Sequence, residues 1–191
     1  YHTQGYIVAP EFIDPDVLAR AQNAIPADHP HAATYFENPD AYPIYRKTQF
    51  TLKKFPFGDF DLNRVVVDDA LLQAARTLLQ TPEIRLTKGE FWAKYAGAIN
   101  YDQGFHRDFF NHTLVVPRTD HLYKELTTFV YLNDVTEEGG ATGVLPRSLT
   151  DDISFGSGNL PDKPSFDPSK EEIRATGPAG SVLFYSYDVF H

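Results

Sequence analysis

Two stretches of the chain have the apolar spacing of amphipathic helices. In residues 14–25, DPDVLARAQNAI, apolar positions recur every three to four residues and form one stripe: Val17, Leu18, Ala21 and Ile25. Asp14 can cap this helix, and Pro15 fits its first turn. A short β-like stretch, residues 6–8, precedes it. The pattern therefore predicts a strand followed by a helix near the start of the chain.

A second helix is predicted within residues 65–80, VVVDDALLQAARTLLQ. Asp68 or Asp69 lies near its start, and the side chains expected to face inward are Leu71, Leu72, Ala75, Leu78 and Leu79. Between the two helices, residues 26–48 contain four prolines and are predicted to be mostly irregular.

After Pro82 the pattern becomes β-like. Residues 84–97 alternate apolar and polar positions in places, and residues 126–135 form a β-rich run that ends at a turn over residues 137–140. A short β-like piece follows at 142–148, then a long loop over 150–170 rich in Gly and Pro. The last strand is predicted in residues 180–190, after a Pro178-Ala179-Gly180 turn.

Helices followed by a run of short strands predict an α+β fold with a mainly β core, built on a sandwich or barrel. At 191 residues, the chain is expected to form a single domain, with helical support over residues 1–82 and the β core over 83–191. The sequence starts at Tyr1 rather than Met and stops at His191 within a β-like run. We therefore expect the natural protein to continue past His191, and its true start is left open.

Composition narrows the class of protein. The net charge of −9 argues against nucleic acid as a partner, and no apolar run is long enough to span a membrane. Cysteine is absent, which excludes disulfides and thiolate metal sites and favours a cytoplasmic location. The oligomeric state is left open.

The triplet His106-Arg107-Asp108 has two chemical interpretations. In a protein kinase it would open the catalytic loop, with an Asn five residues after the Asp. Here that position is Thr113, and the chain has no Gly-rich phosphate loop and no Asp-Phe-Gly. The kinase interpretation is therefore rejected.

The second interpretation is a metal site. On a strand, His106 and Asp108 face the same side while Arg107 faces away. Non-haem iron enzymes bind Fe(II) with two His and one carboxylate. The third ligand must then come from one of the other histidines: His2, His29, His31, His112, His121 or His191. We choose His191, 85 residues after His106, because a strongly β-like segment carries it to the core.

Four segments in order resemble the phytanoyl-CoA dioxygenase family of Fe(II)- and 2-oxoglutarate-dependent oxygenases. GYIVAPEFIDPDVLARAQ is similar to the N-terminal segment and helix of the family, and WAKYAGAINYDQGFHRD to the strand with a Lys before the His-x-Asp. FVYLNDVTEEGGATGVLPRSL and GSVLFYSYDVFH resemble the following strand pair and the strand that delivers the distal His. The resemblance implies a double-stranded β-helix, a cupin-like jelly roll, with flanking N-terminal helices.

The resemblance also implies site residues. His106, Asp108 and His191 become the iron ligands, with 2-oxoglutarate as cosubstrate and O2 as oxidant. Lys94 lies where the family has a Lys close to the cosubstrate, and Phe129 where an aromatic lines that pocket. Thr128 is a further candidate, for a hydroxyl contact.

The sequence departs from the family at three places. Arg107 stands where Gln is frequent, and Pro146-Arg147-Ser148-Leu149 where Pro-Gly-Ser-His is common. The Arg that pairs with the far carboxylate of 2-oxoglutarate follows the distal His in the family, beyond the last residue here.

We expect a dioxygenase that hydroxylates or otherwise oxidises a small molecule. Halogenation is not expected, because related halogenases have a small residue in place of the carboxylate that Asp108 supplies. The alternative is a non-catalytic cupin-like barrel that binds metal or ligand with an incomplete cosubstrate site. A metal hydrolase is less favoured, since no general base is found beside the ligands. Four aromatic residues are expected near the metal, mostly as core: Tyr101, Phe105, Phe109 and Phe110. Three arginines could meet an anionic substrate, but each is expected instead to be a solvated surface charge: Arg107, Arg118 and Arg147.

Overall fold

The computed structural model describes residues 1–47, 52–98, 103–108, 125–154 and 157–191. Its largest sheet is antiparallel, in the order β1-β7-β4, and consists of β1 (Tyr6–Ala9), β7 (Val182–Ser186) and β4 (Leu126–Val130). Two small antiparallel sheets pair β2 (Lys53–Lys54) with β3 (Glu90–Phe91), and β5 (Gly143–Val144) with β6 (Ile173–Arg174). Within these described ranges the strands do not close into a barrel.

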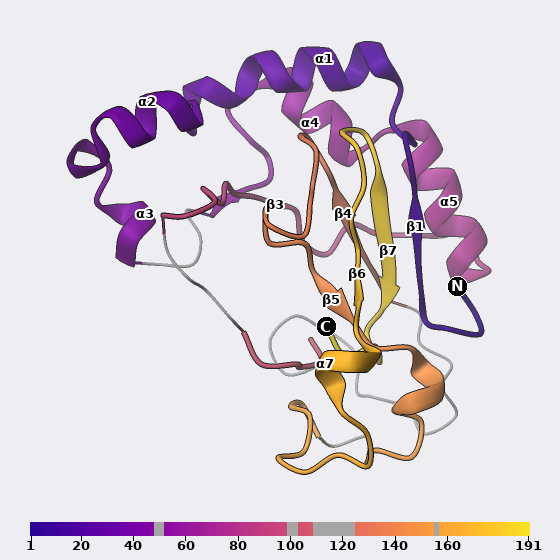
Figure 1. Cartoon of the computed structure of the whole chain (residues 1–191). Helices are drawn as coiled ribbons and strands as arrows, with labels where there is room; N and C mark the ends of the chain where they lie inside the picture. The colour runs from indigo at the N-terminus through magenta and orange to yellow at the C-terminus, as the bar shows by residue number, and fades with distance from the viewer. Residues whose placement is uncertain (48–51, 99–102, 109–124, 155–156) are drawn as a thin grey trace.

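Three helices pack on the largest sheet: α1 (Pro15–Ala24), α4 (Phe60–Val66) and α5 (Asp69–Leu79). Figure 1 shows α1 across one end of the sheet and the C-terminus beside β5 and α7, at the other end. The remaining helical segments are short: η1 (Ile25–Ala27), α2 (Ala32–Glu37), η2 (Pro39–Ala41), α3 (Ile44–Lys47), η3 (Arg147–Leu149) and α7 (Pro168–Glu171).

The two faces of the largest sheet meet different partners, because side chains alternate along each strand. Val182 and Phe184 of β7 pack with the helices in one hydrophobic cluster, together with Ile13, Val17, Ala21, Leu62, Val65 and Leu71. Leu183 and Tyr185 point the other way, into a second cluster with Tyr6, Tyr131, Val144, Ala175 and Val189. The second face is the one that leads to the candidate site.

The helix predictions are confirmed in part. The first helix begins at Pro15, and the Asp14 carboxylate accepts hydrogen bonds from the backbone N–H groups of Asp16 and Val17. The second begins at Asp69, but only Leu71 of its expected inward set is fully buried. The expectation that residues 26–48 are mostly irregular is wrong, because Pro26 and Pro39 occupy first turns of short helices, where a missing N–H costs nothing.

The β predictions are also confirmed in part. Residues 126–130 are a strand, and residues 137–140 and 179–180 are turns. Residues 84–97, however, contain only the two-residue strand β3, and the 150–170 loop ends in α7. The chain is thus a mixed α/β protein with several antiparallel strands, and the jelly roll stays a prediction.

Candidate metal centre

Three side chains predicted as metal ligands lie together: His106, Asp108 and His191. One ligand atom from each lies within 4.8 Å of the others, and no other such group of His, Cys, Asp and Glu occurs among the described residues. His106 Nε2 is 3.9 Å from Asp108 Oδ1, and His191 Nε2 is 3.7 Å from Asp108 Oδ2. The two imidazole ring centres are 4.6 Å apart.

Backbone pairing brings the distant ligands side by side. The His106 N–H donates to the His191 carbonyl (3.1 Å), and the His191 N–H donates back to the His106 carbonyl (3.0 Å). His106 also forms an antiparallel bridge with Asn159, and the Arg107 N–H donates to the Gly158 carbonyl at 2.7 Å. The segment around His106 is therefore extended, so the expected alternation of side chains holds although it forms no regular strand.

His191 does not end a strand, contrary to the expectation. Strand β7 stops at Ser186, and the chain turns through residues 187–189 before it reaches His191. The Val189 N–H donates to the Ser186 carbonyl at 3.0 Å, which closes this turn and takes the chain out of the ladder. The turn, rather than continued strand pairing, sets the place of the third ligand.

Both imidazoles are oriented by backbone carbonyls. His106 Nδ1 lies 3.1 Å from the Gly104 carbonyl oxygen, and His191 Nδ1 lies 3.3 Å from the Val189 carbonyl oxygen. A carbonyl oxygen only accepts, so each Nδ1 must carry the hydrogen. The Nε2 lone pairs of both rings are then available to a metal, as is typical of histidine ligands.

Tyr185 of β7 was not anticipated from the sequence, yet it contacts two of the three ligands. Its hydroxyl donates to Asp108 Oδ2 at 3.1 Å and lies 3.4 Å from His191 Nε2. Burial, reinforced by the Asp108 carboxylate, raises the pKa of Tyr185 well above its usual value, so the phenol stays protonated. Tyr185 lies two residues after Leu183 on the last predicted strand, so both side chains face the same side of the sheet. This spacing was the one sequence signal that could have identified Tyr185 as a residue of the site.

Strand β4 places the other predicted residues on different faces. Phe129 lies on the same face as Tyr185, with ring centres 5.4 Å apart, and its ring also contacts Trp92. Thr128 pairs in register with Phe184 and so faces the helices. Thr127 pairs with Tyr185 and is the hydroxyl on the site face.

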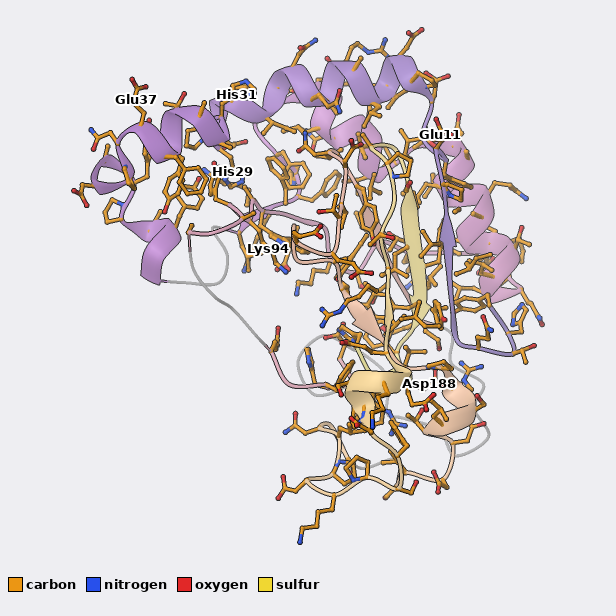
Figure 2. All side chains as sticks on the ribbon, in the orientation of Figure 1. Glu11, His29, His31, Glu37, Lys94 and Asp188 are labelled. Carbon is orange, nitrogen blue, oxygen red and sulfur yellow. The ribbon has the colours of Figure 1, made fainter. Side chains whose placement is uncertain are left out.

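Lys94 follows β3 and is exposed. Loss of part of its hydration lowers the pKa of its ammonium group. Figure 2 shows Lys94 on the segment between the α2–α3 region and the sheet.

A cleft of about 640 Å³ borders the candidate centre. Its walls come from two segments, residues 103–107 and 158–161, and include His106, Phe105 and Leu160. The Gln103 amide nitrogen lies 3.4 Å from His106 Nε2 within this cleft. Phe105 is the one of the four expected aromatic residues that the structure describes there; Tyr101, Phe109 and Phe110 lie outside the described residues, as do His112, His121 and Arg118.

Arg107 and Arg147 are not solvated surface charges, contrary to the expectation. Arg107 is only 4% exposed, and its guanidinium donates to backbone carbonyls. Arg147 pairs with the buried Asp188. Arg107 faces away from the ligands, as the strand pattern predicts, but what lies there is the neighbouring backbone rather than water.

The three side chains fit a divalent metal. Two neutral imidazoles and a carboxylate are the donor set of non-haem Fe(II) sites, and Asp108 is buried where an unpaired carboxylate would be costly. With bonds of about 2.1 Å, neighbouring ligand atoms around a metal lie roughly 3 Å apart. The observed 3.7 Å and 3.9 Å need only a small inward movement of the side chains.

Comparison with known families agrees with the site. The family model described as Phytanoyl-CoA dioxygenase (PhyH) matches residues 1–191. The chain belongs to the phytanoyl-CoA dioxygenase family, and this membership implies an oxygenase that acts on a small molecule. No individual curated protein matches the sequence. None of the helices in the described ranges is long and apolar enough to cross a membrane.

Proposed function

We propose that the protein is an Fe(II)- and 2-oxoglutarate-dependent dioxygenase that hydroxylates or otherwise oxidises a small molecule. The observation that carries this proposal is the convergence of His106, Asp108 and His191 in a chain of this family. We also propose that the chain forms a single domain and that a jelly roll encloses these three residues.

His106, Asp108 and His191 would hold the iron on one face and leave the opposite face for cosubstrate and oxidant. Iron bound there would supply the activation of dioxygen, coupled to the oxidation of 2-oxoglutarate to succinate and carbon dioxide.

The protein's own part is orientation and exclusion of water. The Gly104 and Val189 carbonyls fix the two imidazoles, and the Tyr185 phenol donates to Asp108, so all three ligands are preorganised. Phe129, packed on the Tyr185 ring, would line the cosubstrate pocket and shield it from bulk water.

Lys94 is proposed as a cation for a cosubstrate carboxylate, because an ammonium group and a carboxylate attract each other. For the hydroxyl contact, the register favours Thr127 over Thr128, because Thr127 shares the face of Tyr185. The cleft beside His106 would admit the substrate, with Phe105 and Leu160 offering apolar contact.

The test is the binding of Fe(II) and 2-oxoglutarate without oxygen, followed by succinate release when oxygen is admitted. We expect a visible absorption band for the complex in the wild-type protein. His106→Ala and His191→Ala should abolish the band and weaken metal binding by at least about 100-fold, since even outer partners of a metal site contribute 10–100-fold.

His31→Ala is the matched control, because His31 is an exposed histidine outside the group. Wild-type protein without any band would contradict the proposal. Metal binding without succinate release for any substrate would favour the non-catalytic barrel instead.

A further inference from the structure

The 187–189 turn connects the last strand to His191, and its geometry determines where that ligand lies. We infer that Arg107 and Arg147 hold this turn through Asp188, and that Asp188 is thereby a positioning residue for the metal centre. The inference rests on the proposed function, because it assigns these residues a role toward the same site.

Arg147 donates two hydrogen bonds to the Asp188 side chain. Arg147 Nε donates to Oδ2 and Nη2 donates to Oδ1, each at 2.8 Å, and the two side chains are only 16% and 3% exposed. Burial opposes the charge of Arg147, but the Asp188 carboxylate outweighs it and raises the pKa of the guanidinium. A forked, largely buried pair of this kind fixes geometry far better than a surface ion pair.

Arg107 holds the backbone of the same residue. Its Nε donates to the Asp188 carbonyl at 2.9 Å, and its guanidinium carbon lies 4.0 Å from the centre of the Phe190 ring. The remaining guanidinium nitrogens donate to the carbonyls of Thr150 (3.3 Å) and Ser154 (3.4 Å). Arg107 lies between His106 and Asp108 in sequence, so one side chain ties the first two ligands to the turn that carries the third.

The N-terminal segment closes the turn from the other side. Arg147 Nη1 donates to the His2 carbonyl at 2.7 Å, and the Gly5 carbonyl accepts from the Ser186 N–H at 2.8 Å. Figure 2 shows Asp188 at the end of β7 that lies away from α1, where these segments meet. The turn is thus held through the Asp188 side chain, the Asp188 carbonyl and the end of strand β7. His191 follows three residues after Asp188.

The experiment compares Asp188→Asn and Arg147→Met with a matched pair, Glu172→Gln and Arg174→Met. The matched pair also breaks an arginine–carboxylate contact (2.7 Å), but between the end of α7 and β6 rather than at the turn. Co(II) is titrated into each protein as a spectroscopic probe, and the thermal midpoint of the metal-free protein is recorded beside it. We expect Asp188→Asn and Arg147→Met to weaken Co(II) binding by about 10–100-fold, as loss of outer partners does, and the matched pair to leave it within about twofold.

A second measurement does not depend on metal binding. In metal-free protein labelled with ¹⁵N at histidine, the His191 imidazole should show the Nδ1–H form that donates to the Val189 carbonyl, and Asp188→Asn should alter that signal. His29 is the internal reference, because its Nδ1 contacts the Tyr45 hydroxyl, away from the turn.

The inference is overturned if Asp188→Asn and Arg147→Met bind Co(II) like wild type, or if the matched pair weakens binding equally for the same loss of thermal stability. If wild-type protein bound no Co(II), the proposed function would fail. The imidazole spectrum would still decide the inference: an unchanged His191 signal in Asp188→Asn overturns it.

Discussion

At the scale of single residues, one close contact lies where the N-terminal segment meets the 187–189 turn. Gly5 has a φ of +86°, and a Cβ atom there would lie 2.3 Å from Val189 Cγ2. Gly97 has the same φ of +86°, but a Cβ there would meet no atom of the described residues within 4 Å. The two glycines share a backbone conformation and differ only in their surroundings.

Alanine at these two positions separates backbone strain from collision. We expect Gly97→Ala to lower the free energy of unfolding by about 1 kcal/mol, the cost of a left-handed conformation for an L-residue. Gly5→Ala should lose about 2–4 kcal/mol, because Val189 must also shift. Urea unfolding measures the free energy of unfolding of both variants. Equal losses would show that Val189 moves away from the added Cβ at little cost in free energy.

The common orientation of His106 and Asp108 was predictable at this scale, because their two-residue spacing needs only an extended backbone. The surroundings of Arg107 were not predictable. Nothing local in the sequence indicates that the Asp188, Thr150 and Ser154 carbonyls converge on one guanidinium. These contacts span 43 to 81 residues of sequence.

At the scale of elements, the helices α1, α4 and α5 each begin with an aspartate N-cap. Asp14, Asp59 and Asp68 each accept hydrogen bonds from the backbone N–H groups of the second and third residues that follow. The caps of α1 and α5 could be read from the sequence, whereas α4 was not anticipated. Its seven residues are too few for a clear periodicity.

The N-cap of α5 can be tested by replacing Asp68 and, for comparison, the adjacent Asp69. Asp68 Oδ1 accepts from the Ala70 N–H (3.0 Å) and the Leu71 N–H (3.1 Å), so Asp68→Ala should cost about 1 kcal/mol of unfolding free energy. Asp69→Ala should cost a few tenths at most, because that carboxylate contributes only through the helix dipole. Chemical denaturation of both variants is the measurement, and equal losses would contradict the assigned cap.

The strands were less predictable than the helices, because a strand exists only where a partner offers backbone groups. Residues 126–130 pair with β7 along their whole length, as their β-rich composition suggests. Residues 84–97 alternate as well, yet among the described residues only Glu90 and Phe91 form strand pairs, with the two-residue strand β2. Alternation therefore indicated which side chains could face inward, but not how far pairing extends.

At the scale of the whole molecule, a third buried cluster lies apart from the sheet, around Tyr35, Tyr45 and Tyr95. His29 is buried beside it at 1% exposure, with Nδ1 2.8 Å from the Tyr45 hydroxyl and its ring in a T-shaped contact with Phe91. The tyrosine hydroxyl can donate to Nδ1 while His29 Nε2 keeps its hydrogen. Burial lowers the pKa of His29, partly offset by the nearby Asp28.

This histidine makes folding stability depend on pH. Because its pKa is lower in the folded state, the unfolded chain takes up a proton first, near the ordinary value of about 6.5. The unfolding free energy should therefore be highest above that pH and fall as the pH is lowered through it. His29→Gln should flatten this fall between about pH 7 and pH 5, as measured by urea unfolding at several pH values.

His31→Gln is the control, since His31 is exposed two residues away and should leave the pH profile as it is. Figure 2 shows both histidines beside the helical segment from α1 to α2. An unchanged profile in His29→Gln would mean that other groups carry the pH dependence.

The sequence by itself determined what depends on neighbouring residues: two helix starts, the turns, the β-rich runs and the His-x-Asp pair. Tertiary structure decided what depends on residues far apart in the chain. It ended β7 at Ser186, brought His191 to His106 through a turn, and buried Arg107 and Arg147 around Asp188. The physical reason is that periodicity and caps act over a few residues, whereas a buried carbonyl, guanidinium or carboxylate must find its partner wherever the chain supplies one.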